Sequence, residues 1–260
     1  MRIVLPQRGW LFDLDGTVYL GEQLLPGAAE TIAALRGDGR RVAFLSNKPL
    51  YTRGDYAEKL TRLGIPTTAD EVVNSSIVLV RHLHKLDPGA PVFVIGEAPL
   101  IGELRAQGFE VRDDAEVRWV VIAFDRTFDY AKLNTALQAV RRRDARLIAT
   151  NPDRTCPVEG GEIPDCAGMI AAVEAVTGKP VEAIVGKPSP IILQVALEAL
   201  GVTASECVIV GDRIETDIEM GKRLGLATVL VLSGITQPGD PRIAALAPDL
   251  VLPDIRSLLG

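Results

Sequence analysis

The chain has 260 residues, of which 47% are hydrophobic and 24% charged, an ordinary composition for a globular protein of one large or two modest domains. Its 28 basic and 34 acidic residues give a formal net charge of −6, which argues against a nucleic acid or an anionic membrane as a partner. Three cysteines without CxxC spacing favour neither a disulfide framework nor a structural zinc site. No signal-peptide pattern and no apolar run long enough for a membrane helix is evident, so we expect a cytoplasmic protein.

Short apolar runs alternate with helical patterns along the chain. The runs lack clean polar alternation, which is typical of strands covered on both faces. They predict strands at 10–14, 41–45, 92–95, 119–124, 146–150, 207–210 and 228–232. Helices are expected near 28–37, 53–63, 75–86, 98–107, 130–142, 167–177, 190–200 and 215–224. This alternation predicts an α/β fold with a mostly parallel, doubly wound sheet, whose ligands bind beyond the carboxyl ends of the strands.

The first expected strand runs directly into the segment DLDGT. Asp13 and Asp15 lie two residues apart at its end, where their mutual repulsion favours a hard dication bound by carboxylate and carbonyl oxygens. Gly16 permits a sharp turn and Thr17 offers a hydroxyl. Asp and Gly are also common simply as turn formers, so this segment alone leaves a plain turn open.

Two further loops carry groups that suit a phosphoryl oxygen. Ser46 and Asn47 follow the second expected strand and offer a hydroxyl and an amide, although such a pair before proline is often only a loop. Lys187 lies just ahead of the helix expected at 190–200, whose amino end favours an anion. A solvated surface lysine is the commoner case for any single lysine.

A second pair of acids follows the expected strand at 207–210. Asp212 lies at the strand end, and Asp217 lies five residues later at the start of a helix, where an acid also complements the helix dipole. Two strands therefore each deliver paired carboxylates to one edge of the same sheet. The coincidence favours a functional site over two unrelated turns.

In this order, DLDGT, SN, a lysine and GDRIETD resemble the motifs of the haloacid dehalogenase (HAD) superfamily. More narrowly, FDLDGTVYLGEQLLPGA, ATNPDRT, VGKPSP and GDRIETDIEMG look like its NagD-type branch of p-nitrophenyl and nucleotide phosphatases. The resemblance spans essentially the whole chain. It implies a Rossmann-like core, residues 1–77 and 183–260, with an inserted α/β cap domain at 78–182. Ser46 stands where many members carry Thr, and Cys156 and Cys166 stand where many members have other residues.

The resemblance also implies a mechanism. Mg²⁺ is expected on Asp13, the Asp15 carbonyl and Asp212, with Asp217 orienting metal-bound water. Asp13 is expected to be the nucleophile that forms an aspartyl phosphate, and Asp15 the general acid and base. The phosphoryl oxygens are expected to be held by Ser46, Asn47 and Lys187. An acid at position 15 favours phosphoryl transfer over dehalogenation, because a leaving halide needs no proton.

The expected activity is Mg²⁺-dependent hydrolysis of a small phosphate monoester, such as a nucleotide or sugar phosphate. A phosphotransferase or mutase of the same superfamily remains an alternative, as does a module that has lost turnover. Asn151, Asp153 and Arg154 follow an expected cap strand and are candidate substrate-specificity residues, although Asn-Pro-Asp is also a strong turn signal. Homo-oligomerisation through the cap is common in relatives and stays open here.

Overall fold

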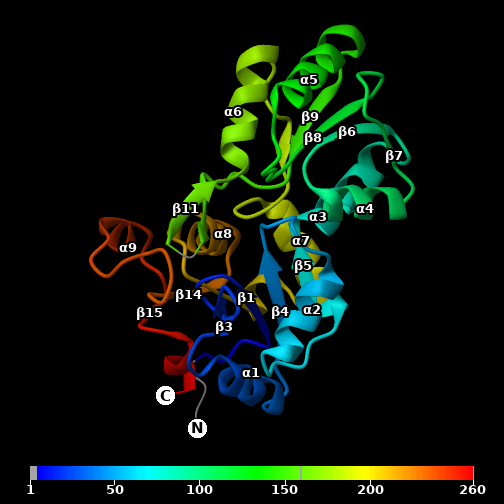
Figure 1. The fold of residues 1–260 in the computed structure, drawn as a ribbon. Helices are drawn as coiled ribbons and strands as arrows, with labels where there is room; N and C mark the ends of the chain where they lie inside the picture. Colours follow the sequence, from blue (N-terminus) through cyan, green and yellow to red (C-terminus); the bar gives the residue numbers. More distant parts are fainter. Residues whose placement is uncertain (1–4, 159, 260) are drawn as a thin grey trace. The chain divides into compact units, whose positions relative to one another are not determined.

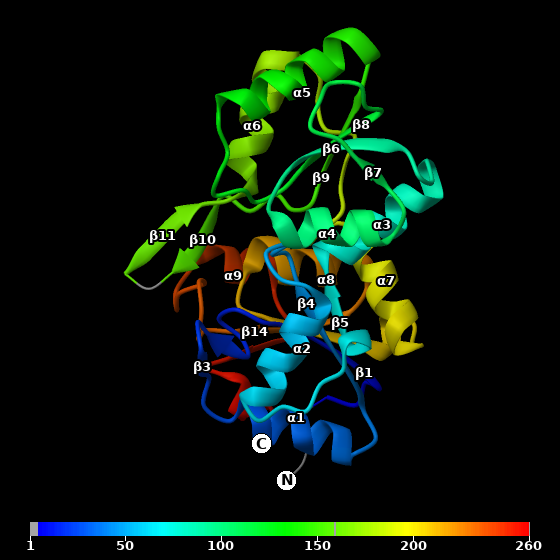
Figure 2. The same ribbon diagram turned by 45° about the vertical axis from the view of Figure 1, so that its right-hand side comes forward.

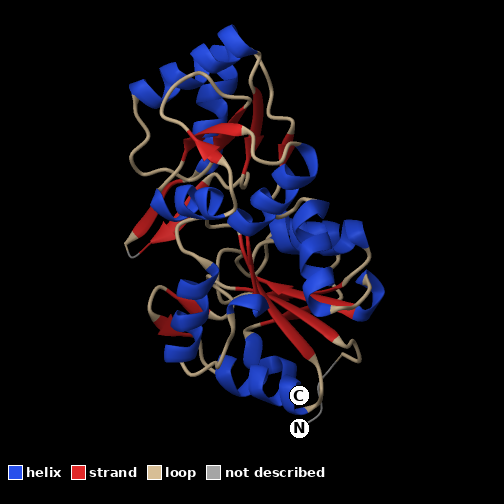
Figure 3. Cartoon of the chain, turned by 90° about the vertical axis from the view of Figure 1, so that its right-hand side faces the viewer, coloured by secondary structure: helices blue, strands red, loops and turns tan. Residues whose placement is uncertain are grey.

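The computed structural model describes residues 5–158 and 160–259, which form two compact units (Figure 1). Unit 1 comprises residues 5–46, 53–73 and 187–259, and unit 2 comprises residues 47–52 and 74–186 of the described chain. Figure 3 shows that each unit has its own group of sheet strands flanked by helices. The two units are therefore described one at a time.

Unit 1 is built on a six-stranded sheet of order β15-β14-β13-β1-β4-β5. Its neighbouring strands from β15 to β4 pair in parallel. β1 lies between β13 and β4, and all five of its residues are buried. The strands are β1 Gly9–Asp13, β4 Arg41–Ser46, β5 Val72–Asn74, β13 Cys207–Gly211, β14 Ala227–Val231 and β15 Leu250–Leu252, and a small hairpin joins β2 Tyr19–Leu20 to β3 Gln23–Leu24.

Helices cover both faces of this sheet, which explains the continuous apolar runs of its strands. On one face, Trp10 and Phe12 of β1 share a core with Ile32 of the first helix and Leu60 of the second. On the other, Leu230 packs with Ile214 and Ile218. The helices are α1 Ala28–Gly37, α2 Arg53–Arg62, α7 Pro190–Leu200, α8 Glu219–Leu224 and α9 Pro241–Leu246, with short helical turns η1 Ala69–Glu71, η2 Ala204–Glu206, η3 Ile214–Ile218 and η4 Ile255–Leu259.

Unit 2 contains a five-stranded sheet of order β12-β9-β8-β6-β7, in which all described pairings are parallel (Figure 2). Ile95 and Ile122 pack against Ala136 and Val173 from two helices on one face. The strands are β6 Pro91–Ile95, β7 Glu110–Val111, β8 Trp119–Ile122, β9 Arg146–Ala149 and β12 Ala183–Ile184, and β10 Thr155–Val158 and β11 Gly161–Pro164 form an antiparallel hairpin. The helices are α3 Ser75–Leu86, α4 Ala98–Ala106, α5 Tyr130–Arg143 and α6 Cys166–Thr177.

The structure confirms the predicted α/β class, with a parallel six-stranded core sheet in unit 1 and a second parallel sheet in unit 2. All seven expected strands are present, and seven of the eight expected helices match closely. The eighth, expected at 215–224, begins one residue earlier as the π-helical turn η3 and continues as α8. The short strands β5, β7, β12 and β15, both hairpins and α9 were not predicted, because so few residues carry no periodic signal.

Compactness alone does not define a domain boundary, so the ranges 1–77, 78–182 and 183–260 stay a prediction. All three cysteines are buried and free. None of the helices in the described part of the chain combines the length and the apolarity that a bilayer crossing requires.

Candidate active site

Asp13 is the last residue of β1, at the carboxyl edge of the unit 1 sheet. A tight turn follows, in which the Leu14 carbonyl accepts the Val18 amide at 2.9 Å and the Gly16 amide donates to the Tyr19 carbonyl at 2.8 Å. Gly16 has φ +85°, a left-handed conformation that glycine adopts without a steric cost. The turn therefore depends on the glycine of DLDGT, and it leaves Asp15 half-buried beside the strand end.

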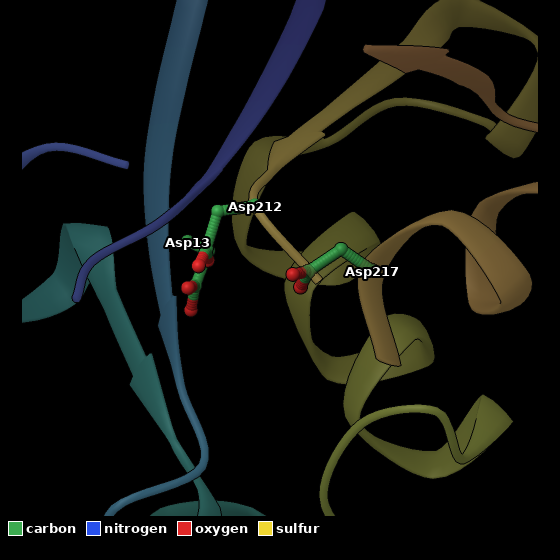
Figure 4. Close-up of side chains that lie close together, drawn as sticks. All are labelled: Asp13, Asp212 and Asp217. Carbon is green, nitrogen blue, oxygen red and sulfur yellow. The ribbon is translucent and has the colours of Figure 1, made fainter. Parts of the chain in front are cut away.

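Two further acids reach the same place from β13 and the turn that follows it. Asp212 comes directly after β13, and Asp217 lies in η3, where its Oδ2 accepts the Arg213 amide at 3.3 Å. One carboxylate oxygen from each of Asp13, Asp212 and Asp217 lies within 4.8 Å of the other two (Figure 4), and all three residues are buried. π-Helical turns are often found at functional sites, as this one is.

Glycines allow these carboxylates to approach the backbone. A Cβ at Gly211 would lie 2.3 Å from Cγ of Asp217. Cβ atoms at Gly16 and Gly234 would lie 2.6 and 2.0 Å from Oδ2 of Asp212. Real Cβ contacts are never this short, so the positions of both acids require glycine at all three places.

The segment after β14 supports Asp212, and sequence reasoning missed it. Oδ2 of Asp212 accepts the Ile235 amide at 2.7 Å, and the Asp212 carbonyl accepts the Thr236 amide at 3.1 Å. The Ser233 hydroxyl donates to the Gly16 carbonyl at 2.7 Å and so ties this segment to the first turn. One sequence feature could have indicated this segment: the expected strand at 228–232 is followed by two small residues, Ser233 and Gly234, at the sheet edge where ligands bind.

Lys187 links two of the three acids. Its Nζ lies 2.5 Å from Oδ1 of Asp13 and 2.7 Å from Oδ1 of Asp217, and the residue is 3% exposed. Burial opposes the charge of the ammonium, but the two carboxylates outweigh it and raise the pKa of Lys187 above its ordinary value. The position of Lys187 is therefore compatible with its predicted role in the site. Its burial excludes the alternative that Lys187 is a solvated surface lysine.

Helix α7 holds Lys187 at this position. Its N-cap is Ser189, whose Oγ accepts the Ile191 amide at 3.3 Å, and Pro190 fills its first turn. Gly201 ends the helix in a left-handed conformation. The sequence predicted each of these three features.

One ammonium does not neutralise three buried acids. Burial, with Asp13 and Asp217 nearby, raises the pKa of Asp212 well above the ordinary value. Burial also raises the pKa of Asp217 to about 6, against the lowering effect of Lys187. Among the described residues, Oδ1 of Asp212 and Oγ1 of Thr17 are buried without a hydrogen-bond partner. Excess negative charge, an all-oxygen donor set and an orphaned carboxylate oxygen fit a hard divalent cation.

Ser46, the second of the three residues predicted to bind phosphate, ends β4 and is buried. Its hydroxyl donates to the Tyr56 hydroxyl of α2 at 3.0 Å. Sequence reasoning missed Tyr56, because nothing in the helical pattern at 53–63 distinguishes it from a core aromatic residue. Asn47, the next residue, belongs to unit 2, where its amide donates to Oδ2 of Asp153 at 3.0 Å.

The three predicted specificity residues follow β9 in unit 2. Asn151 is fully buried, Asp153 is half-buried and Arg154 is exposed. The Asn151 amide donates to Asp153 at 2.9 Å, so the structure brings these two side chains together. That these three residues contact a substrate and set specificity stays a prediction.

Two family models match the chain, a haloacid dehalogenase-like hydrolase at residues 10–110 and a HAD-hydrolase-like model at 184–258. The chain is 42% identical to the sugar-phosphatase AraL of Bacillus subtilis strain 168, with 96% of this chain and 91% of the relative covered. A p-nitrophenyl phosphatase from Archaeoglobus fulgidus superposes with a TM-score of 0.91 at 34% identity, covering 97% of this chain and 98% of the other. NagD from Escherichia coli K-12 gives 0.85 at 30% identity, covering 97% and 98%.

These matches run through both units, and the buried group Asp13, Asp212 and Asp217 is consistent with a metal site typical of HAD phosphatases. The chain belongs to the haloacid dehalogenase superfamily, in its NagD and p-nitrophenyl phosphatase-like branch, and is a phosphatase that acts on phosphoric monoesters.

Proposed function

We propose that the chain hydrolyses small phosphate monoesters with Mg²⁺ and an aspartyl-phosphate intermediate on Asp13. One observation carries the proposal: Asp13, at the end of a fully buried strand, shares a cluster with two further acids and is held by the ammonium of Lys187. A carboxylate so placed is fixed in direction and shielded from water. Sugar phosphates are the first substrates to test, since the relative AraL is a sugar-phosphatase.

The metal would be held by Asp13, the Asp15 carbonyl and Asp212, with Asp217 in support. Magnesium suits this oxygen-only set better than zinc, because the described residues that form the cluster include no His or Cys. When bound, Mg²⁺ would neutralise charge on the phosphoryl group and so permit attack by an anion.

The chemical steps fall to two aspartates. Asp13 forms a bond to phosphorus while the ester P–O bond breaks, and Asp15 gives its proton to the departing alkoxide. Asp15 then takes a proton from water, whose oxygen attacks phosphorus and releases inorganic phosphate and free Asp13. Asp15 lies in the turn that follows β1 and is half-buried. This partial exposure suits a group that exchanges a proton with both the leaving group and water.

The remaining groups would bind the phosphoryl oxygens or the leaving group. Lys187 would stabilise the phosphoryl oxygens in every ester, because it contacts Asp13, the residue proposed to bond to the phosphorus that all esters share. Ser46 and Asn47 would add a hydroxyl and an amide. We further propose that Arg154, exposed in unit 2, contacts the leaving group and biases the choice among esters.

A panel of phosphate esters assayed with Mg²⁺ tests this function through release of inorganic phosphate. Nucleotides, sugar phosphates, glycerol phosphate and phosphoglycolate span the expected class. Asp13→Asn should lower turnover of every ester by more than about a hundredfold, because an amide of nearly the same size is a very poor nucleophile. Asp70→Asn is the matched control, since the Asp70 side chain is 95% exposed on the surface of the same unit.

Two results would count against the proposal. Asp13→Asn with more than about a hundredth of wild-type activity would remove the covalent intermediate. Transfer of the phosphoryl group to an added alcohol or sugar, with little release of inorganic phosphate, would identify a phosphotransferase instead.

A further inference from the structure

Asn47 is held by a network of polar side chains inside unit 2. Its Nδ2 donates to Oδ2 of Asp153 at 3.0 Å, and the same oxygen accepts Nδ2 of Asn151 at 2.9 Å. Asn47 is 8% exposed and Asn151 is fully buried. Two amide donors on one carboxylate oxygen restrict the rotation of all three side chains.

The network continues to the amino end of α6. Nδ2 of Asn151 also donates to Oδ1 of Asp165 at 3.0 Å, and Oδ1 of Asn151 accepts the Thr150 hydroxyl at 2.8 Å. Asp165 is the N-cap of α6, where its side chain accepts the Cys166 amide at 2.6 Å. Asn151 is therefore fixed on both its oxygen and its nitrogen, and it provides a rigid support for Asp153.

The backbone of Asn47 is fixed as well. Its carbonyl accepts the hydroxyl of Ser75, the first residue of α3, at 2.7 Å. A Cβ at Gly186 would lie 2.7 Å from Oδ1 of Asn47 and 2.5 Å from the Thr150 carbonyl, so Gly186 is the residue that leaves room for this side chain. Asp153 therefore holds the side chain of Asn47, and Ser75 holds its backbone.

We propose that Asp153 is a positioning residue that acts through Asn47, and that it does not bind the leaving group. The inference rests on the proposed function, because Asn47 is bonded to Ser46 and both are assigned there to the phosphoryl group. One N–H of the Asn47 side-chain amide donates to Asp153, and because the amide is planar this contact sets the direction of the other N–H. Without Asp153, Asn47 rotates away and the phosphoryl group loses a fixed donor.

A double-mutant cycle tests whether Asp153 acts through Asn47. Asp153→Ala, Asn47→Ala and the double variant are compared by kcat/KM on p-nitrophenyl phosphate, a sugar phosphate and a nucleotide. Small displacements in a site commonly lower rates by about 10- to 100-fold, so each single variant should show a loss of this size, by one common factor for all three esters. The double variant should be no slower than Asn47→Ala within about threefold, because the second change removes an interaction already lost.

Three controls separate positioning from general damage. Asp153→Asn keeps an acceptor oxygen of the same size and should recover most of the activity that Asp153→Ala loses. Asp113→Ala removes an exposed acid of the same unit and should behave as wild type. Thermal unfolding of each variant reports any loss of fold, and Asp153→Asn keeps the test valid where the alanine variant is unstable.

Hydrogen–deuterium exchange of the peptide that spans 46–52 adds a readout that does not need turnover. Asp153→Ala should speed exchange there, and Asp113→Ala should not. If the wild-type protein releases phosphate from no ester, the proposed function is wrong. If Asp153→Ala leaves hydrogen exchange at 46–52 unchanged, this inference alone is wrong. Losses that differ more than about tenfold between esters, or that multiply in the double variant, would make Asp153 a substrate contact instead.

Discussion

Replacing Lys187 by Met probes the electrostatic design of the site most directly. Methionine keeps an unbranched apolar chain one atom shorter than that of lysine, and it removes the charge together with its hydrogen-bond donors. In the absence of metal, this leaves Asp13, Asp212 and Asp217 buried together without the ammonium that now bridges two of them. We expect the metal-free variant to lose stability in unit 1, and the variant supplied with Mg²⁺ to have lower activity on every ester than the parent protein.

The size of the stability loss follows from the distances. At an effective dielectric constant of about 20, charges 2.5 and 2.7 Å apart attract by about 6 to 7 kcal/mol for each pair. The cost of taking the ammonium out of water offsets much of this attraction. Breaking a buried ion pair by removing one partner has a net cost of about 3 to 5 kcal/mol. We therefore expect Lys187→Met to lower the free energy of unfolding of unit 1 by about this amount.

Each unit contains one of the two tryptophans, Trp10 in unit 1 and Trp119 in unit 2, which suits a local assay. In a Trp119→Phe background, fluorescence of Trp10 during denaturant unfolding reports unit 1 alone. Measurements in chelator and in Mg²⁺ are compared near neutral pH. Because a dication can replace the missing positive charge, Mg²⁺ should stabilise Lys187→Met more than it stabilises the parent protein.

Lys222→Met is the matched control. Lys222 pairs with Asp249 at 3.0 Å on the surface of the same unit, and loss of such an exposed pair costs about 1 kcal/mol or less. The reasoning fails if Lys187→Met in chelator unfolds within about 1 kcal/mol of its parent, as the control should. It also fails if Mg²⁺ stabilises both proteins equally.

Three further predictions concern the metal, the packing of the site and the choice of ester. Activity should need a divalent cation, with Mg²⁺ preferred and chelation inhibitory, and full activity after exhaustive chelation would remove the metal from the mechanism. Gly234→Ala places a Cβ 2.0 Å from Oδ2 of Asp212, so the Mg²⁺ concentration for half-maximal activity should rise at least about tenfold, while Gly37→Ala, with open space around it, should leave this value unchanged. Arg154→Ala should change the ratios of kcat/KM between unlike esters more than it changes the average kcat/KM. A loss of kcat/KM by one common factor for all esters would argue against a leaving-group contact.

The sequence by itself determined the fold class and the order of the main elements. Buried strands such as 207–210 carry a continuous apolar signal, and α7 carries a cap, a proline and a terminal glycine at the expected places. It also indicated which acids gather at one sheet edge, because parallel strands end on the same side, Asp13 ends one strand and Asp212 directly follows another.

Only the tertiary structure showed which residues contact the acids of this cluster. Lys187 is 174 residues from Asp13 along the chain, and the local pattern around it is equally compatible with a solvated lysine. Ser233 and Gly234 carry no motif, and their importance comes from the depth at which Asp212 is buried. Asn-Pro-Asp signals a turn from its local conformation, whereas the contact between Asp153 and Asn47 joins residues 106 apart. Such pairings depend on the packing of distant segments, which local propensity and periodicity do not encode.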